Sequence, residues 1–230
     1  MIDVHSPETS APEVRLLALS VGMPSHLGRH RGRPVESGFR KHQVEGDTVS
    51  IGLTNIRGDG QADLTVHGGP EKAVYAYSAD WHEGWLAAAP ELGRIPPAYF
   101  GENLTVAGWV EPDVWIGDIW AWGAARLQVC QPRWPCFKFS LATGHPKFGK
   151  IMLQNGWTGW YFRVLAPGDA PVRGPIAVSE RSSDEITVFD AHAAMMPGAD
   201  RDLVQRVIAA PALAENWRKS LIQSLDSSRR

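Results

Sequence analysis

The chain has 230 residues, 43% hydrophobic and 21% charged, which is typical of a globular protein with one large domain or one domain and a small appendage. A net charge of −2 argues against a basic surface for nucleic acid or anionic membrane. Two cysteines, Cys130 and Cys136, are too few for a disulfide framework and indicate a reducing, cytoplasmic setting. Residues 1–12 lack the apolar core of a signal peptide, and no run approaches the ~18 apolar residues of a membrane span.

Short β-rich runs recur between Gly- and Pro-rich turns over most of the chain. They cover residues 14–21, 48–53, 73–77, 126–129, 159–165 and 175–178. Many short strands with loops of irregular length predict a barrel or sandwich and not a doubly wound sheet. One helical insertion is expected over residues 79–89, capped by Ser78, with Trp81, Trp85 and Ala88 on its apolar stripe.

The C-terminal part of the chain changes to helical patterns. Thr187 and Asp190 have the spacing of a capping box, and Pro197 then ends that helix. Two more apolar stripes follow, formed by Leu203, Val204, Val207 and Ile208 and by Leu213, Trp217, Leu221 and Leu225. Because three short helices cannot each bury a stripe alone, we expect them to pack together and on the barrel. This predicts a β-barrel domain over 14–178 and a three-helix domain over 184–226.

The most informative stretch reads Gln-Pro-Arg-Trp-Pro-Cys-Phe-Lys and ends at Lys138. Its two prolines restrict the backbone ahead of Cys136. Arg133 and Lys138 flank the thiol with positive charge, which favours the thiolate, the form that acts as nucleophile and metal ligand. The alternative is a small buried apolar residue, which is what most free cysteines are. The stretch alone supports both interpretations of Cys136 equally.

A second stretch, His67-Gly68-Gly69-Pro70-Glu71-Lys72, lies between two predicted strands. The glycine pair allows backbone N–H groups to converge on an anion, and Lys72 adds a charge that could hold a phosphate. His67 could donate a hydrogen bond, move a proton or bind a metal. For the glycine pair taken alone, a hairpin turn with an exposed lysine is the simpler explanation.

A third stretch, Phe100-Gly101-Glu102-Asn103-Leu104, places a carboxylate and an amide after a glycine. Such a pair could bind the donor and acceptor edge of a heterocycle. The alternative is a loop whose polar side chains bond their own backbone. Residues 37–41 and 155–161 are weaker candidates of the same kind, and we expect Lys41 and Tyr161 at the rim of a pocket.

Taken together and in order, three stretches resemble the signature of MOSC-domain proteins, a family named after the C-terminal domain of molybdenum-cofactor sulfurases. They are His67-Gly68-Gly69 with Lys72, then Phe100 to Leu104, then Gln131-Pro132-Arg133 with Pro135-Cys136. The helical tail resembles the appendage of the stand-alone bacterial YiiM-type branch, so the resemblance extends from about Val14 to Leu225. It implies a mainly β fold with α additions, in which a MOSC β-barrel is followed by a small three-helix unit.

The resemblance also implies a molybdopterin-type molybdenum cofactor with Cys136 as the protein ligand to molybdenum, which agrees with the preference of thiophilic metals for thiolate. The cofactor residues that it implies are His67, Gly68, Gly69, Lys72, Glu102, Asn103, Arg133 and Cys136. YiiM-type proteins resemble reductases that convert N-hydroxylated compounds, notably 6-N-hydroxylaminopurine, to amines. An electron-donating reductase or flavoprotein would be the partner, and Cys136 and His67 would be the catalytic residues.

Two other functions are compatible with the same residues. A non-catalytic carrier of the cofactor or of activated sulfur would hold a persulfide on Cys136. A metal-free enzyme would use Cys136 as nucleophile and His67 as base. We expect Cys130 in the core, with a redox pairing to Cys136 as its alternative. Trp134 departs from the family pattern and would narrow the mouth of the site, which affects the substrates that enter.

Overall fold

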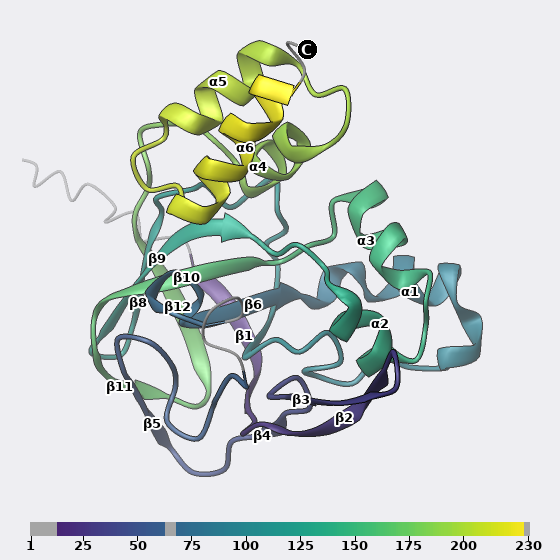
Figure 1. Ribbon diagram of the computed structural model, residues 1–230. Coiled ribbons are helices and arrows are strands. Elements are labelled where there is room, and N and C mark those ends of the chain that lie inside the picture. The colour runs from purple at the N-terminus through teal and green to yellow at the C-terminus, as the bar shows by residue number, and fades with distance from the viewer. Residues whose placement is uncertain (1–12, 63–67, 228–230) are drawn as a thin grey trace, which may run out of the picture.

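A closed sheet forms the centre of the molecule, whose computed structural model describes residues 13–62 and 68–227. Neighbouring strands of the ring are β12 (Gly174–Glu180), β8 (Ile119–Trp122), β9 (Ala125–Pro132), β10 (Trp160–Ala166), β6 (Val74–Ser78), β7 (Leu104–Ala107) and β1 (Glu13–Val21). β1 also pairs with β12, so the ring closes (Figure 1). β6 and β7 run parallel, and the other neighbours run antiparallel. The predicted mainly β fold with a barrel is confirmed.

Shorter strands lie outside this ring. β2 (Ser25–His30) and β3 (Arg33–Ser37) form a hairpin, β5 (Thr48–Ile51) pairs with β11 (Gly168–Pro171), and β4 (His42–Gln43) pairs with the end of β1. The sequence patterns did not predict the hairpin, because β2 and β3 each bury a single side chain, Leu27 and Val35. Strands with so few apolar positions give little period-two signal.

Aromatic side chains fill the inside of the barrel. Trp120 has no exposed surface, and its ring centroid lies 5.0 Å from that of Phe162 and 5.8 Å from that of Trp160. Both contacts are edge-to-face, the arrangement that aromatic quadrupoles favour. Trp120 and Trp160 therefore pack in the core of the barrel.

Three helices follow or interrupt the barrel strands on one side: α1 (His82–Ala88), α2 (Phe137–Thr143) and α3 (Phe148–Asn155). The helix predicted over 79–89 begins instead with a 3-10 turn, η2 (Ala79–Trp81), whose cap is Ser78 as expected. Within α1, Trp85 is buried and Ala88 is exposed, whereas Ala89, the C-cap residue, is buried. The prediction that Ala88 belongs to the apolar stripe of this helix was therefore wrong.

The C-terminal residues form the three predicted helices, α4 (Val188–Met195), α5 (Arg201–Ala209) and α6 (Glu215–Ser227), which pack on one end of the barrel (Figure 1). The capping box is confirmed, since Thr187 Oγ1 accepts from Asp190 N at 2.8 Å and the Asp190 carboxylate accepts from Thr187 N at 3.0 Å. Helices and barrel share one buried core, and the division into domains 14–178 and 184–226 stays a prediction. No helix in the described ranges is both long and apolar enough to cross a membrane.

A buried carboxylate joins η2, the turn that leads into α1, to the residue before β10. Glu111 has no exposed surface and accepts hydrogen bonds from Trp81 Nε1 and Gly159 N, each at 2.6 Å. Burial raises the pKa of Glu111 from its ordinary 4.5 to about 7, although both hydrogen bonds oppose the change. Between these pH values the folded chain therefore binds a proton that the unfolded chain has released.

We expect this carboxylate to make folding stability fall as pH rises from 4.5 to about 7. Urea unfolding at pH 5 and pH 8 should show the wild type losing about 2–3 kcal/mol relative to Glu111→Gln, because one pH unit of pKa difference corresponds to about 1.4 kcal/mol. The amide does not titrate, so a difference between the two proteins that stays constant with pH would contradict the assignment.

Candidate active site

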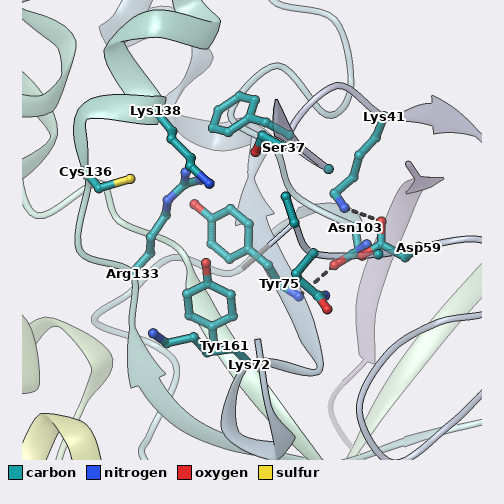
Figure 2. Close-up of a pocket in the computed structure, with 16 residues that line it drawn as sticks. Ser37, Lys41, Asp59, Lys72, Tyr75, Asn103, Arg133, Cys136, Lys138 and Tyr161 are labelled. Carbon is teal, nitrogen blue, oxygen red and sulfur yellow. Dashed lines mark hydrogen bonds and ion pairs between the residues drawn. The ribbon is translucent and has the colours of Figure 1, made fainter. Parts of the chain in front are cut away.

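Cys136 lies where the loop after β9 enters α2 (Figure 2). It lines two neighbouring hollows. The thiol is half-buried, and the Cys136 carbonyl accepts the first hydrogen bond of α2 from Phe139 N at 2.9 Å. No helix was predicted at α2, because its seven residues are too few for a clear helical period. The prolines thus lead the chain out of a strand and into a short helix, with the cysteine at the turn.

We call the first hollow the inner pocket. Its described lining comes from residues 37–39 and 41, residues 59–62, the loop before β7, the turn before β6, the start of α2, and side chains at or near the ends of β6, β9 and β10. The two loops meet closely, because a Cβ on Gly38 would lie 1.9 Å from the carbonyl oxygen of Gly60. Only glycine therefore fits at position 38.

Cations predominate in the inner pocket. Lys41, Lys72, Arg133 and Lys138 line it together with a single carboxylate, that of Asp59, among the described residues. Lys41 forms an ion pair with Asp59, and the two side chains are 6% and 2% exposed. Burial lowers the pKa of Lys41, and the charge of Asp59 opposes that effect. The pocket therefore carries excess positive charge and suits an anion.

Arg133 is held rigidly in the pocket wall. Its guanidinium carbon lies 4.8 Å, 5.0 Å and 5.2 Å from the ring centroids of Tyr75, Phe139 and Phe39. One guanidinium nitrogen donates a hydrogen bond to the Phe100 carbonyl. The side chain is 8% exposed, so these cation–π contacts replace much of its hydration. Arg133 thus contributes a fixed charge to the pocket.

Lys72 ends the 3-10 turn η1 (Pro70–Lys72) and lines both hollows. Its backbone N–H donates to the Gly69 carbonyl at 3.0 Å, and Gly69 has a φ of 95°, a conformation that favours glycine. Burial lowers the pKa of Lys72, while the negative charges of the Cys136 thiolate and Glu71 oppose the change. The charges of Lys72 and Cys136 therefore influence each other.

The Glu102 side chain bonds the backbone of its own loop, which is the alternative considered for this stretch. Its carboxylate accepts from Ala98 N at 2.7 Å, Phe100 N at 3.0 Å and Thr105 Oγ1 at 2.9 Å, and it is fully buried. It is absent from the lining of the inner pocket and supports its own turn, and its contact with a pterin or substrate stays a prediction. Burial raises the pKa of this carboxyl, and the hydrogen bonds oppose that effect.

Asn103 does line the inner pocket, but its amide is already used. Its Oδ1 accepts from Tyr75 N, and its Nδ2 donates to the Ser20 carbonyl, each at 3.1 Å. The side chain therefore joins β1 to β6 beneath the pocket floor. Of the remaining predicted residues, Gly68 and Gly69 are half-buried just before η1, and His67 lies outside the described residues.

Several pocket residues were not predicted as site residues. Tyr75 and Tyr161 face each other with ring centroids 4.9 Å apart, and Figure 2 shows both beside Arg133. Tyr161 was expected only at the rim, and Tyr75 not at all. All five residues of β6 are buried, so period-two alternation could not separate a pocket-facing tyrosine from a core one.

We call the second hollow the outer chamber, which has a volume of about 410 Å³. It shares Lys72, Arg133, Cys136 and Tyr161 with the inner pocket. Its other described lining residues are Gln131, Pro132, Trp134, Met195, Asn216, Trp217 and Ser220. The C-terminal helices α4 and α6 thus provide one wall, a contribution that no local sequence pattern indicated.

Comparisons with known proteins agree with this geometry. A family model described as the MOSC domain matches residues 63–180. The chain is also 37% identical over 213 residues to the uncharacterized protein YflK of Bacillus subtilis, a match that covers 92% of this chain and 94% of that protein. The chain belongs to the MOSC-domain family.

Other comparisons show which further proteins this MOSC-domain protein is similar to. It is 36% identical over 194 residues to protein YiiM of Escherichia coli, covering 83% of this chain and 84% of that protein. The crystal structure of YiiM from Escherichia coli matches with a TM-score of 0.76 at 28% identity and covers 94% of each chain. A protein named reductase from Gibberella moniliformis is 32% identical over 80% of this chain, which corresponds to 31% of the fungal protein.

The two cysteines of this MOSC-domain protein should differ sharply in reactivity. Cys130 is fully buried, and burial raises the pKa of its thiol to about 12, with the charge of Arg163 opposing. Because the thiolate is the reactive form, Ellman's reagent should label Cys136 in the native protein and Cys130 only after unfolding. The fast phase should vanish in Cys136→Ser. Equal labelling rates for the two thiols in the native protein would contradict the structure.

Removing the Glu102 carboxylate should unfold the protein more easily. Glu102→Ala leaves two buried N–H groups and a hydroxyl without their acceptor, so we expect a loss of about 2–3 kcal/mol in the free energy of unfolding. The control is Glu180→Ala, whose side chain is 58% exposed and whose ion pair with Arg126 should contribute less than about 1 kcal/mol. Equal urea midpoints for the two variants would refute the structural role of Glu102.

Proposed function

We propose that this protein binds the molybdenum cofactor and uses it to reduce N-hydroxylated compounds, such as 6-N-hydroxylaminopurine, to amines. The observation that carries the proposal is the position of Cys136, a half-buried thiol on the wall shared by a cation-rich pocket and an open chamber. Membership of the MOSC family and the reductase name of the fungal relative support it.

The donor set fits a cofactor that brings most of its own metal ligands. Among the residues that the structure describes, no cluster of three or more His, Cys, Asp or Glu side chains could hold a metal by itself. A single soft thiolate suits a thiophilic metal whose other ligands come from a dithiolene-bearing pterin. Cys136 would therefore be the protein ligand to molybdenum.

The cations of the inner pocket fit the phosphate of such a cofactor. Lys72, Lys138 and the fixed guanidinium of Arg133 would hold it, with Lys41 and Asp59 stabilising the neighbouring loops. Asn103 would contribute as part of the pocket floor. His67, Gly68 and Gly69 remain in the proposed cofactor site because of their place in the family motif.

When bound, the cofactor supplies the two-electron chemistry that removes oxygen from an N–OH group. The protein must position the substrate and provide protons, since RNHOH, two electrons and two protons give RNH2 and water. Lys72 Nζ and Tyr161 Oη line both hollows and can hold protons there. Burial raises the pKa of Tyr161, opposed by the charge of Arg133, so its hydroxyl remains a proton donor at neutral pH. A partner reductase or flavoprotein would supply the electrons.

The proposal predicts that molybdenum binding depends on Cys136 and not on Cys130. Protein from a cofactor-competent host should carry molybdenum and pterin and reduce 6-N-hydroxylaminopurine anaerobically with a chemical electron donor. Cys136→Ser should lose most of its molybdenum because a hydroxyl is a poor ligand for a thiophilic metal. The control Cys130→Ala removes a buried thiol and should retain the metal.

Three outcomes would count against the proposal. Full molybdenum content in Cys136→Ser would exclude Cys136 as the ligand. A molybdenum-loaded wild type that reduces no N-hydroxylated compound with a competent donor would exclude the reductase activity. A labile sulfur adduct on Cys136 in intact-mass measurements, without any reduction, would favour the sulfur carrier.

A further inference from the structure

We propose that the outer chamber is the substrate subsite, and that Trp134 together with Asn216 of α6 makes it selective for flat, uncharged aromatic N-hydroxylated compounds. This inference rests on the proposed reductase function and names the residues of this chain that would choose its substrates. It assigns the C-terminal helices a part in recognition in addition to their packing role.

The two hollows differ in charge. The inner pocket has four cationic side chains and one carboxylate among its described lining residues. Among the described residues of the outer chamber, the charged ones are Lys72 and Arg133, both on the wall shared with the inner pocket. An anionic cofactor group therefore suits the inner pocket, and an uncharged molecule suits the remainder of the chamber.

Trp134 presents a flat apolar surface to the chamber. Its side chain is 41% exposed, whereas Trp217 behind it is 6% exposed. The two ring centroids lie 5.9 Å apart in an edge-to-face contact, and the ring of His192 lies 5.9 Å from that of Trp134. Trp217 is itself fixed by a hydrogen bond from Nε1 to the Ala191 carbonyl at 3.2 Å. The Trp134 indole is thus braced in place and ready to stack on a planar ligand.

Hydrogen bonds at the start of α6 attach this helix to β9 and η1, which lie beside the proposed cofactor site. Ala214 N donates to the Cys130 carbonyl at 2.9 Å, and Glu215 N donates to both oxygens of the Glu71 carboxylate at 3.1 Å. Glu71 precedes Lys72 in η1. These bonds hold Asn216, one turn from Ser220, at a fixed position over the chamber.

Polar groups on the α6 wall suit the edge of a heteroaromatic ring. The Asn216 amide can donate and accept, and Ser220 Oγ keeps acceptor capacity while it donates to the Asn216 carbonyl at 3.0 Å. A compound that stacks on Trp134 with its N–OH group toward Cys136 would direct its other edge to these side chains. An aliphatic hydroxylamine would gain neither contact.

Binding can be measured without the cofactor, using adenine as the amine product of 6-N-hydroxylaminopurine. We expect calorimetric titration of cofactor-free protein to show an affinity for adenine that falls about tenfold in Trp134→Leu, since stacking on a tryptophan contributes about that factor. Asn216→Ala should weaken adenine binding severalfold. Phe189→Leu is the matched control, because Phe189 is also 41% exposed, on α4, and does not line the chamber.

Turnover by loaded protein provides the second measurement. In Trp134→Leu the KM for 6-N-hydroxylaminopurine, divided by that for hydroxylamine, should rise about tenfold. Equal adenine affinity in wild type and Trp134→Leu, with an unchanged KM ratio, overturns the inference while leaving the reductase proposal standing. A loaded wild type that binds adenine through Trp134 but reduces neither compound overturns the reductase proposal and still supports the chamber as a site for flat ligands.

Discussion

The register of three neighbouring strands determines where the site lies. Tyr161 of β10 pairs with Tyr75 of β6 on one side and with Gln131 of β9 on the other. Residues just outside these pairs must then come together, and they include Arg133 after β9 and Lys72 before β6. Because closure of the barrel fixes this register, cations far apart in the sequence meet around one thiol.

The cost of burying these cations shapes the rest of the pocket. Lys41 is compensated by Asp59, which also accepts from Gly22 N at 2.8 Å. Arg133 is compensated by three aromatic rings and a carbonyl. Such internal compensation keeps the pocket folded before any ligand arrives, and an anionic ligand would then meet charges already held in place.

The family resemblance grouped Lys72, Arg133 and Cys136. Local patterns in the sequence predicted β1, β6, β9, β10 and β12 of the ring and the capping box of α4, but they missed β7 and β8. They failed where a residue type serves two purposes. A glutamate after glycine suits a ligand and a turn equally, so the role of Glu102 depended on donors three or four residues away that only the fold defines. Local sequence patterns could not predict the outer chamber, because Trp134 and Trp217 meet only through tertiary packing.

Glu71 explains why the family motif and the C-terminal helices belong to one site. Its carboxylate pairs with Arg163 at 2.8 Å and accepts from Glu215 N, while its carbonyl accepts from Gln131 Nε2 at 2.8 Å. One residue thus holds the turn that presents Lys72, the strand that leads to Cys136, and the first turn of α6. A displacement of α6 would therefore be transmitted to Lys72, so the helical appendage is mechanically part of the site and can vary its chamber-facing side chains to suit a substrate.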